Sequence, residues 1–196
     1  MNTRRSLRAI RYSGMADMLD RYTLDSFETP DDERRSIKQA ATDFVKAGEG
    51  WFYIAGRSGS GKTHICTAIC GELIRRGYQT LYMLWRDEST KLKSGLLERE
   101  WYEYRIKKLK TYPVLYIDDF WKAKKTDGHV KVTDGDVNLA FEILNYRYNN
   151  SKLRTIISSE MTLEEVLDID EAIGSRIYER SRGFTKKAPE EDWRLR

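Results

Sequence analysis

One segment constrains the fold more than any other: Gly56-Arg57-Ser58-Gly59-Ser60-Gly61-Lys62-Thr63. It follows a glycine-bounded apolar run, Trp51 to Ala55, which is typical of a buried strand, and it precedes a helical segment, Thr63 to Arg76. Glycines at this spacing let backbone N–H groups turn inward around an anion, and the positive end of the following helix strengthens that attraction. The segment therefore predicts a P-loop for nucleotide phosphates. We expect phosphate contacts from Gly56 through His64, with Lys62 reaching the outer phosphates and Thr63 ligating Mg²⁺.

A second polar signal stands at the end of another apolar run. Val114 to Ile117 is followed directly by Asp118 and Asp119. An acid at the tip of a strand beside a P-loop can hold Mg²⁺ through water, and we assign this role to Asp118. Asp119 is then the candidate for polarising an attacking water. Many ATPases carry the longer Glu at that position, so Asp119 indicates slow hydrolysis.

Apolar runs alternate with helical segments along the chain. We predict further strands at Thr80 to Trp85, Val114 to Ile117 and Thr155 to Ile157. This alternation predicts an α/β fold with three layers and a central, mostly parallel sheet, with ligands at the carboxyl ends of its strands. We place that domain at residues 29–196 and a basic arm at residues 1–28.

Local signals predict where the helices begin and end. Thr29 and Pro30 indicate a helix start, with Thr29 as the cap. Asp134 is expected to cap a later helix, and Thr162 with Glu165 forms a capping box before Val166. Residues 87–110 are interpreted as one long charged helix or a helix pair, and a last helix is expected over about 171–180.

Composition excludes several other classes of protein. The 196 residues suit one domain, and no apolar run approaches the roughly 18 residues of a membrane span. The N-terminus is basic but lacks the apolar core of a signal peptide. Cys66 and Cys70 lie four positions apart in one apolar helical segment, where we expect two buried thiols. Such cysteine use fits a reducing compartment, and we expect a cytoplasmic protein.

The motifs together carry a family resemblance. The chain resembles the DnaC/DnaI/IstB group of AAA+ ATPases, and most closely the DnaC-like ATP-binding proteins of Gram-positive phages and prophages. The resemblance covers nearly the whole chain and rests on GSGKTHICTAICGEL (59–73), YMLWRDE (82–88), VLYIDDF (114–120), FEILNYRYNN (141–150), TIISSE (155–160) and IDEAIGSRIYER (169–180). It implies an AAA+ fold, ATP and Mg²⁺ as cofactors, and an ATPase that loads the replicative DNA helicase in DNA replication.

The resemblance also implies roles for arginines near the end of the chain. Arg176 or Arg180 matches the arginine-finger region, in which one subunit neutralises charge in its neighbour's site, and spacing does not choose between them. Arg194, in Asp192-Trp193-Arg194, matches an arginine that acts on the γ-phosphate within its own subunit. Many relatives carry an Asn that senses the γ-phosphate at the end of the strand that here begins at Thr155. This chain has Ser159 and Glu160 at that place, and either of them is the candidate for the sensor role. A finger acting between subunits implies a nucleotide-dependent homo-oligomer, a ring or spiral.

A basic stretch follows the second acid motif and is the predicted contact with single-stranded DNA. We expect Lys122, Lys124, Lys125 and Lys131 to track phosphates and Trp121 to stack on a base. The alternative is an exposed flexible loop. Trp85 and Arg86, with Lys91 and Lys93 beyond them, form a second possible contact, for which core packing of Trp85 is the alternative.

Other functions stay open from the sequence. One is an IstB-like ATPase that assists a transposase, a second is a P-loop kinase for a small molecule, and a third is a nucleotide-gated module without hydrolysis. Helicase loaders usually carry an N-terminal domain that grips the helicase, for which the 28 residues before the ATPase core are too few. We therefore expect a truncated chain, a shortened relative, or a partner contact elsewhere.

Overall fold

The computed structural model describes residues 15–95, 98–122, 125–126, 129–130 and 132–193. Its centre is a five-stranded parallel sheet with the order β2-β3-β6-β1-β7. The strands are β1 (Trp51–Ala55), β2 (Thr80–Leu84), β3 (Val114–Phe120), β6 (Arg154–Ser159) and β7 (Thr185–Lys187). A separate antiparallel pair, β4 (Lys125–Thr126) and β5 (His129–Val130), lies within the segment predicted as a loop.

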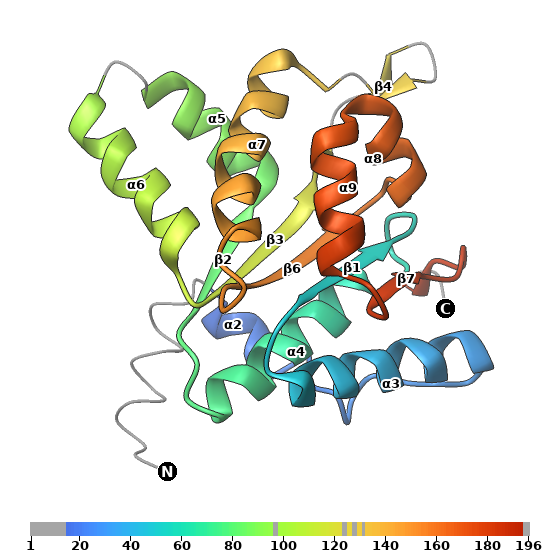
Figure 1. Ribbon diagram of the computed structural model, residues 1–196. Helices are drawn as coiled ribbons and strands as arrows, with labels where there is room; N and C mark the ends of the chain where they lie inside the picture. The colour runs from blue at the N-terminus through green and yellow to red at the C-terminus, as the bar shows by residue number, and fades with distance from the viewer. Residues whose placement is uncertain (1–14, 96–97, 123–124, 127–128, 131, 194–196) are drawn as a thin grey trace.

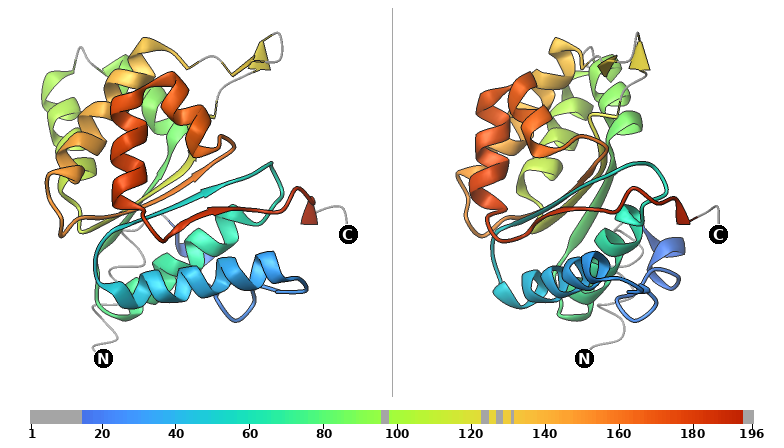
Figure 2. Two further views of the ribbon diagram at one scale, coloured as in Figure 1. Left: turned by 45° about the vertical axis from the view of Figure 1, so that its right-hand side comes forward. Right: turned by 90° about the vertical axis from the view of Figure 1, so that its right-hand side faces the viewer.

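Helices cover both faces of the sheet (Figure 1). One face carries α2 (Ala16–Leu19), α3 (Asp32–Ala47) and α4 (Lys62–Arg75). The other carries α5 (Trp85–Ser94), α6 (Arg99–Thr111), α7 (Asp134–Tyr148), α8 (Leu163–Ile169) and α9 (Glu171–Arg180). Figure 2 shows the same three layers from two further sides. The predicted α/β fold is confirmed.

The sheet has a separate hydrophobic core on each face, because successive residues of a strand point to opposite sides. In β1, Trp51 and Tyr53 belong to the core under α5 to α9, whereas Phe52 and Ile54 belong to the core under α3 and α4. All five residues of β1 are buried. Burial on both faces explains why these strands have continuous apolar runs rather than an alternating pattern.

Two helix starts differ from the sequence prediction. Helix α3 is capped by Asp31 rather than Thr29, because Oδ1 of Asp31 accepts a hydrogen bond from the Arg34 backbone N at 2.8 Å. The cap of α7 is Thr133, not Asp134, and it forms a capping box with Asp136. In both cases the side chain that can reach a free backbone N–H of the first turn decides the start.

Other boundaries are confirmed or shifted slightly. The capping box of Thr162 and Glu165 is present, the last helix is α9, and the charged segment is the helix pair α5 and α6. Trp85 begins α5 instead of ending β2, and β3 continues beyond Ile117 to Phe120. Cys66 and Cys70 are free and buried, as expected.

The packed structure begins upstream of the predicted boundary at residue 28. Met15, Leu19 and Phe27 are buried in the core that α3 and α4 share with the sheet. The first 14 residues, which hold the N-terminal arginines, lie outside the described residues. In the part of the chain that the structure describes, no helix combines the length and apolar character needed to cross a bilayer.

Candidate functional site

The P-loop joins β1 to α4, and its backbone has the conformation that its glycines permit. Gly59 and Gly61 have φ values of +82° and +88°, which side chains rarely adopt. A Cβ atom on Gly59 would also lie 2.0 Å from Oδ1 of Asp192. Glycine is therefore required at this point both by conformation and by the approach of the C-terminal segment.

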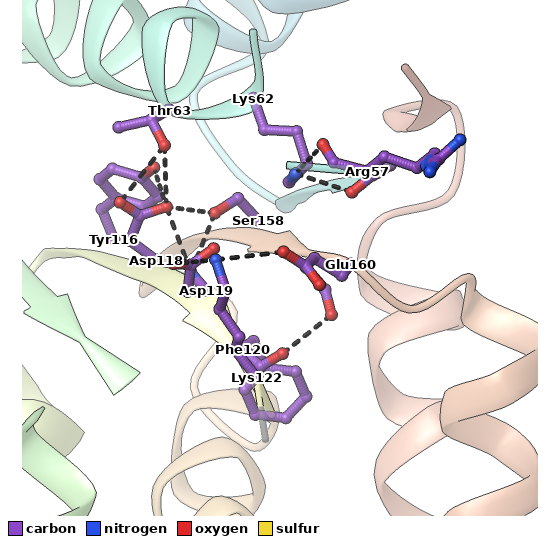
Figure 3. Close-up of polar contacts among 12 residues, drawn as sticks. Arg57, Lys62, Thr63, Tyr116, Asp118, Asp119, Phe120, Lys122, Ser158 and Glu160 are labelled. Atoms are coloured by element: carbon purple, nitrogen blue, oxygen red, sulfur yellow. Dashed lines mark hydrogen bonds and ion pairs between the residues drawn. The ribbon is translucent and has the colours of Figure 1, made fainter. Parts of the chain in front are cut away.

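Lys62 occupies the inside of this loop (Figure 3). Only 5% of the residue is exposed, and its Nζ donates hydrogen bonds to the carbonyl oxygens of Gly56 at 2.7 Å and Arg57 at 2.8 Å. Burial lowers the pKa of Lys62, while the charges of Asp119 and Glu160 oppose that shift. The ammonium group thus lies where the P-loop backbone turns, and its contact with the outer phosphates stays a prediction.

Asp118 stands at the end of β3 and accepts hydrogen bonds from several hydroxyl groups. The hydroxyl of Tyr116 donates to Oδ1 at 2.7 Å, and that of Tyr82 donates to Oδ2 at 3.1 Å. Ser158, at the end of the neighbouring β6, also donates to Oδ1. The backbone N of Asp119 adds a further bond to Oδ1 at 3.2 Å. These donors hold the carboxylate in one orientation.

The two tyrosines remain donors because they keep their protons. Burial raises the pKa of Tyr116 and of Tyr82, and the negative charge of Asp118 shifts both pKa values in the same direction. The sequence interpretation missed Tyr82, Tyr116 and Ser158. Tyr116 had a usable signal, since a residue two positions before Asp118 on a strand shares its face. Tyr82 and Ser158 required knowledge of the strand order.

Thr63 and Asp118 form a pair of oxygen ligands suited to Mg²⁺. Oγ1 of Thr63 lies 3.4 and 3.5 Å from the two carboxylate oxygens of Asp118. Mg²⁺ prefers oxygen ligands and usually takes one or two from the protein and the rest from phosphates and water. The described residues contain no group of three or more His, Cys, Asp or Glu that would hold a metal without a nucleotide. Thr63 and Asp118 fit a Mg²⁺ ion that takes its remaining ligands from phosphates and water.

Asp119 lies beside Asp118 in β3, at the irregularity where the register with β6 shifts. Its φ is +52°, in the left-handed region, and its backbone N also donates to Oγ of Ser158 at 3.2 Å. Nζ of Lys122 lies 3.0 Å from Oδ2 of Asp119 and 3.1 Å from Oε1 of Glu160, so one ammonium group joins two carboxylates (Figure 3). Asp119 is thus placed at the strand ends, paired with a cation.

The structure corrects part of the predicted DNA contact. Trp121 is only 2% exposed and stacks on Phe120 with ring centroids 4.7 Å apart, so it is not available to stack on a base. Its φ of +54° turns the side chain back into the core. Lys122 bonds with the acids of the site instead of extending from a loop. Lys124 and Lys131 lie outside the described residues, and of Lys125 only its place in β4 is described.

A cavity of 280 Å³ adjoins the P-loop. Residues from both ends of the chain line it together with the P-loop: Tyr22, Ser26, Phe27, Glu28, Gly59, Gly61, Lys62, Thr63, His64 and Trp193. The His64 ring lies 5.0 Å from the Tyr22 ring and 5.2 Å from the Phe27 ring, between centroids. The sequence interpretation placed His64 in the site but missed Tyr22, Phe27 and Trp193, because only folding brings the chain ends to the P-loop.

The predicted arginines and the sensor position have different surroundings. Nε of Arg176 donates to Oδ1 of Asn145 at 3.1 Å, and Nη2 of Arg180 donates to the Ser151 carbonyl at 2.8 Å. The hydroxyl of Ser159 donates to the Phe120 carbonyl at 2.8 Å, away from Asp118. Arg194 lies outside the described residues. Among the described residues of one subunit, Lys62 and Lys122 bring ammonium groups to this site.

The parallel sheet, the P-loop before α4 and the acids at the end of β3 define a P-loop NTPase of the AAA+ type. Comparison with known proteins agrees. Residues 1–181 match the family described as IstB-like ATP binding protein, and the chain belongs to this family.

Two individual proteins and one solved structure show which members of the family the chain resembles. It is 39% identical over 129 residues to the phage-like element PBSX protein XkdC of Bacillus subtilis (strain 168), a match that covers 64% of this chain and 46% of that protein. It is 31% identical over 103 residues to the replicative helicase loader DnaI of the same organism, covering 50% and 32%. The crystal structure of the DnaC helicase loader superposes with a TM-score of 0.72 at 22% identity, covering 87% of this chain and 98% of that one.

These comparisons confirm the resemblance to the DnaC/DnaI/IstB group, including its members from phage-like elements. The solved structure supports the fold alone, because its sequence identity is low. The matches cover less than half the length of both Bacillus relatives. What those whole proteins do is therefore carried to this chain only as a proposal.

Proposed function

We propose that this chain is an ATP-hydrolysing helicase loader that acts in DNA replication in the cytoplasm. One observation carries the enzymatic part: buried Lys62 inside the P-loop stands beside the Thr63–Asp118 pair, with Asp119 next to it. This arrangement provides a cation that can bind the phosphates, oxygen ligands for Mg²⁺ and a carboxylate that can accept a proton from the attacking water. The similarity to DnaI, a replicative helicase loader, supports the biological part.

The reaction that these residues support is hydrolysis of ATP to ADP and phosphate. A water oxygen attacks the γ-phosphorus, the bond to the β,γ-bridging oxygen breaks, and Asp119 accepts the proton that the water loses. Lys62 and the backbone N–H groups of residues 56–64 stabilise the charge on the phosphates. When bound, Mg²⁺ supplies further charge neutralisation at Thr63 and Asp118.

The adjoining cavity is the proposed place for the nucleoside. It opens directly beside Lys62 and Thr63, and the aromatic rings of Tyr22, Phe27, His64 and Trp193 line it. Its volume of 280 Å³ lies near the lower end of small-molecule pockets, which start at about 300 Å³. Aromatic walls suit a flat base, so this side of the P-loop would hold the nucleoside half of ATP.

The assembly is proposed by resemblance. We infer a ring or spiral of identical subunits in which Arg176 or Arg180 acts on the neighbour's nucleotide and Arg194 acts on its own. Both described arginines lie on α9, a helix at the surface of the domain (Figure 1). Lys124, Lys125 and Lys131 are the proposed contacts with single-stranded DNA, and the replicative helicase is the proposed protein partner.

Two measurements test this function. Lys62→Ala should abolish ATP turnover because it removes the cation from the P-loop, while Lys46→Ala, which removes an exposed lysine from the last turn of α3, should behave as the wild type. Normal turnover in Lys62→Ala would refute the site. Affinity capture with the replicative helicase, with and without ATP, tests the partner, and no ATP-dependent capture would refute the loader.

A second candidate function is an ATPase that assists a transposase. The family description, IstB-like ATP binding protein, favours it, and it uses the same nucleotide residues. Parallel capture with a transposase separates the two candidates. Capture of the transposase and not the helicase, in the presence of ATP, would establish the second function.

A further inference from the structure

Arg34 on α3 is buried, although arginine is rarely buried unless it is paired. Only 3% of the residue is exposed. Its guanidinium forms an ion pair with Asp31, the cap of the same helix, and a second one in which Nη2 lies 3.1 Å from Oε2 of Glu191. The side chains of Asp31 and Glu191 are 37% and 48% exposed. Arg34 is therefore the buried member of a charged group that joins α3 to the C-terminal segment, residues 188–193.

Arg34 also contacts one wall of the proposed nucleoside cavity. Its guanidinium carbon lies 4.6 Å from the centroid of the Trp193 ring, which is the geometry of a cation–π contact. Trp193 lines the cavity beside the P-loop together with Tyr22, Phe27 and His64. Arg34 is not one of the residues that line this cavity. It therefore contacts the wall of the cavity rather than a ligand inside it.

The main chain of the C-terminal segment is bonded to β1 and to the P-loop. The backbone N of Ala188 donates to the Ala55 carbonyl at 2.7 Å, and that of Trp193 donates to the Gly59 carbonyl at 3.1 Å. These bonds fix where the segment crosses the P-loop, but they do not fix the rotamer of the indole ring. The rotamer depends on side-chain contacts, and Arg34 supplies both an ion pair to the segment and a contact with the ring.

We propose that Arg34 is a positioning residue for nucleotide binding, which holds the Trp193 ring in place as the wall against which the base of ATP stacks. The proposal rests on the proposed ATPase function and its nucleoside cavity. Without the guanidinium, the ring would sample other rotamers, and only a fraction of the molecules would offer the stacking surface. The apparent dissociation constant of the nucleotide rises as that fraction falls. Lys62 and Thr63 should stay in place, because they bond with the P-loop and with Asp118.

The next residue of the same helix supplies a matched control. Arg34 and Arg35 each pair with an acid three positions earlier, Asp31 and Asp32. Arg35 is exposed and belongs to the surface of α3. Arg35→Met therefore removes the same side chain and an ion pair of the same spacing without touching Trp193. It separates a loss of helix stability from a loss of the ring's position.

The test is energy transfer from tryptophan to an ADP that carries a fluorescent N-methylanthraniloyl group on its ribose. Trp193 is one of five tryptophans, so Trp193→Phe first measures its share of the transfer. Arg34→Met should raise the dissociation constant of this nucleotide about five- to tenfold, the effect of losing one desolvated cation–π contact, and should lower the transfer at saturation. Arg35→Met should match the wild type in both quantities.

ATP turnover supplies the second readout. Arg34→Met should raise the KM for ATP by a similar factor and keep kcat within about twofold of the wild type, because the groups at the phosphates are unchanged. Glu191→Gln cuts the half-exposed ion pair but keeps the contact between Arg34 and the ring, so it should raise the dissociation constant about twofold. Circular dichroism checks the folding of each variant, and Glu191→Gln decides the test if Arg34→Met does not fold.

The outcomes separate this inference from the function beneath it. Wild-type affinity and transfer in Arg34→Met, or in Glu191→Gln where Arg34→Met is unfolded, would refute the positioning role. An equal loss of binding in Arg35→Met, or a fall in kcat with an unchanged KM in Arg34→Met, would overturn it as well. If the wild type binds the nucleotide but does not hydrolyse ATP, the proposed ATPase fails and the binding measurements still decide this inference. If the wild type binds no nucleotide, both fail together.

Discussion

Ser158→Ala isolates the hydroxyl that links β6 to the Mg²⁺ ligand on β3. Its Oγ donates to Oδ1 of Asp118 and accepts from the backbone N of Asp119 at 3.2 Å. A hydrogen bond to a charged group contributes about 1.5–3 kcal/mol. Asp118 keeps its bonds from Tyr116 and Tyr82, so we expect the lower end of that range. This corresponds to about a tenfold loss of Mg²⁺ affinity, since 1.4 kcal/mol is a factor of ten.

The neighbouring serine supplies a matched control. Ser158 and Ser159 are both fully buried, but the Ser159 hydroxyl bonds with the Phe120 carbonyl and the Met161 backbone N. Ser159→Ala therefore removes the same atoms from the same strand without touching Asp118. Both variants lose a buried hydrogen bond and should lose stability, so thermal unfolding is measured first to choose a temperature at which both remain folded.

The assay is ATP turnover titrated with Mg²⁺ at saturating ATP. Ser158→Ala should require about ten times more Mg²⁺ for half-maximal turnover, a change of the size seen when a partner of a metal ligand is removed. Ser159→Ala should keep the wild-type requirement. An unchanged requirement in Ser158→Ala, or an equal shift in both variants, would refute the role assigned to this hydroxyl.

Two further predictions concern stability. Arg147 is fully buried and donates to the carbonyls of Leu109, Lys110, Tyr112 and Arg154, so Arg147→Met should lower the free energy of unfolding by about 3–5 kcal/mol, measured by urea unfolding. Burial lowers the pKa of His64, so the unfolded chain binds the proton first as the pH falls below about 6.5. Wild-type stability should therefore decrease more from pH 7 to pH 5 than that of His64→Gln.

The sequence predicted the elements better than their ends. Apolar runs located the strands because both faces of a parallel sheet are buried, and this signal is local. The end of β2 was placed at Trp85 because an aromatic residue continues an apolar run, although the chain already turns into α5 there. The cap at Asp31 was missed because Thr29 and Pro30 present the same kind of signal two residues earlier.

Some residues of the candidate site could be predicted from local sequence and others could not. Lys62, Thr63 and Asp118 could be predicted because each belongs to a motif with a fixed spacing along the chain. Ser158 meets Asp118 only because β6 pairs with β3, and a register shift between Ile117 and Phe120 adjusts the strand ends. Nothing within either segment specifies that pairing. Contacts between distant segments, like the aromatic cavity beside the P-loop, therefore required the structure.

The position of the Trp121 side chain was predicted wrongly, because it depends on the backbone conformation and not on the neighbouring residue types. Its place among lysines favoured a base-stacking role, yet a φ of +54° turns the ring onto Phe120, which also meets Trp85 at 5.0 Å between centroids. Trp121→Ala should therefore lower the free energy of unfolding by about 3–5 kcal/mol, the cost of truncating a buried aromatic residue, whereas an exposed residue would change it by less than about 0.5 kcal/mol.

Urea unfolding of Trp121→Ala and Trp121→Phe decides between the two positions of this ring. The phenylalanine variant keeps most of the packing and should lose much less stability than the alanine variant. A loss below about 1 kcal/mol in Trp121→Ala would contradict a buried ring, because core truncations of this size cost several times more. If that small loss came with weaker binding of oligodeoxythymidylate, the side chain would face the nucleic acid after all.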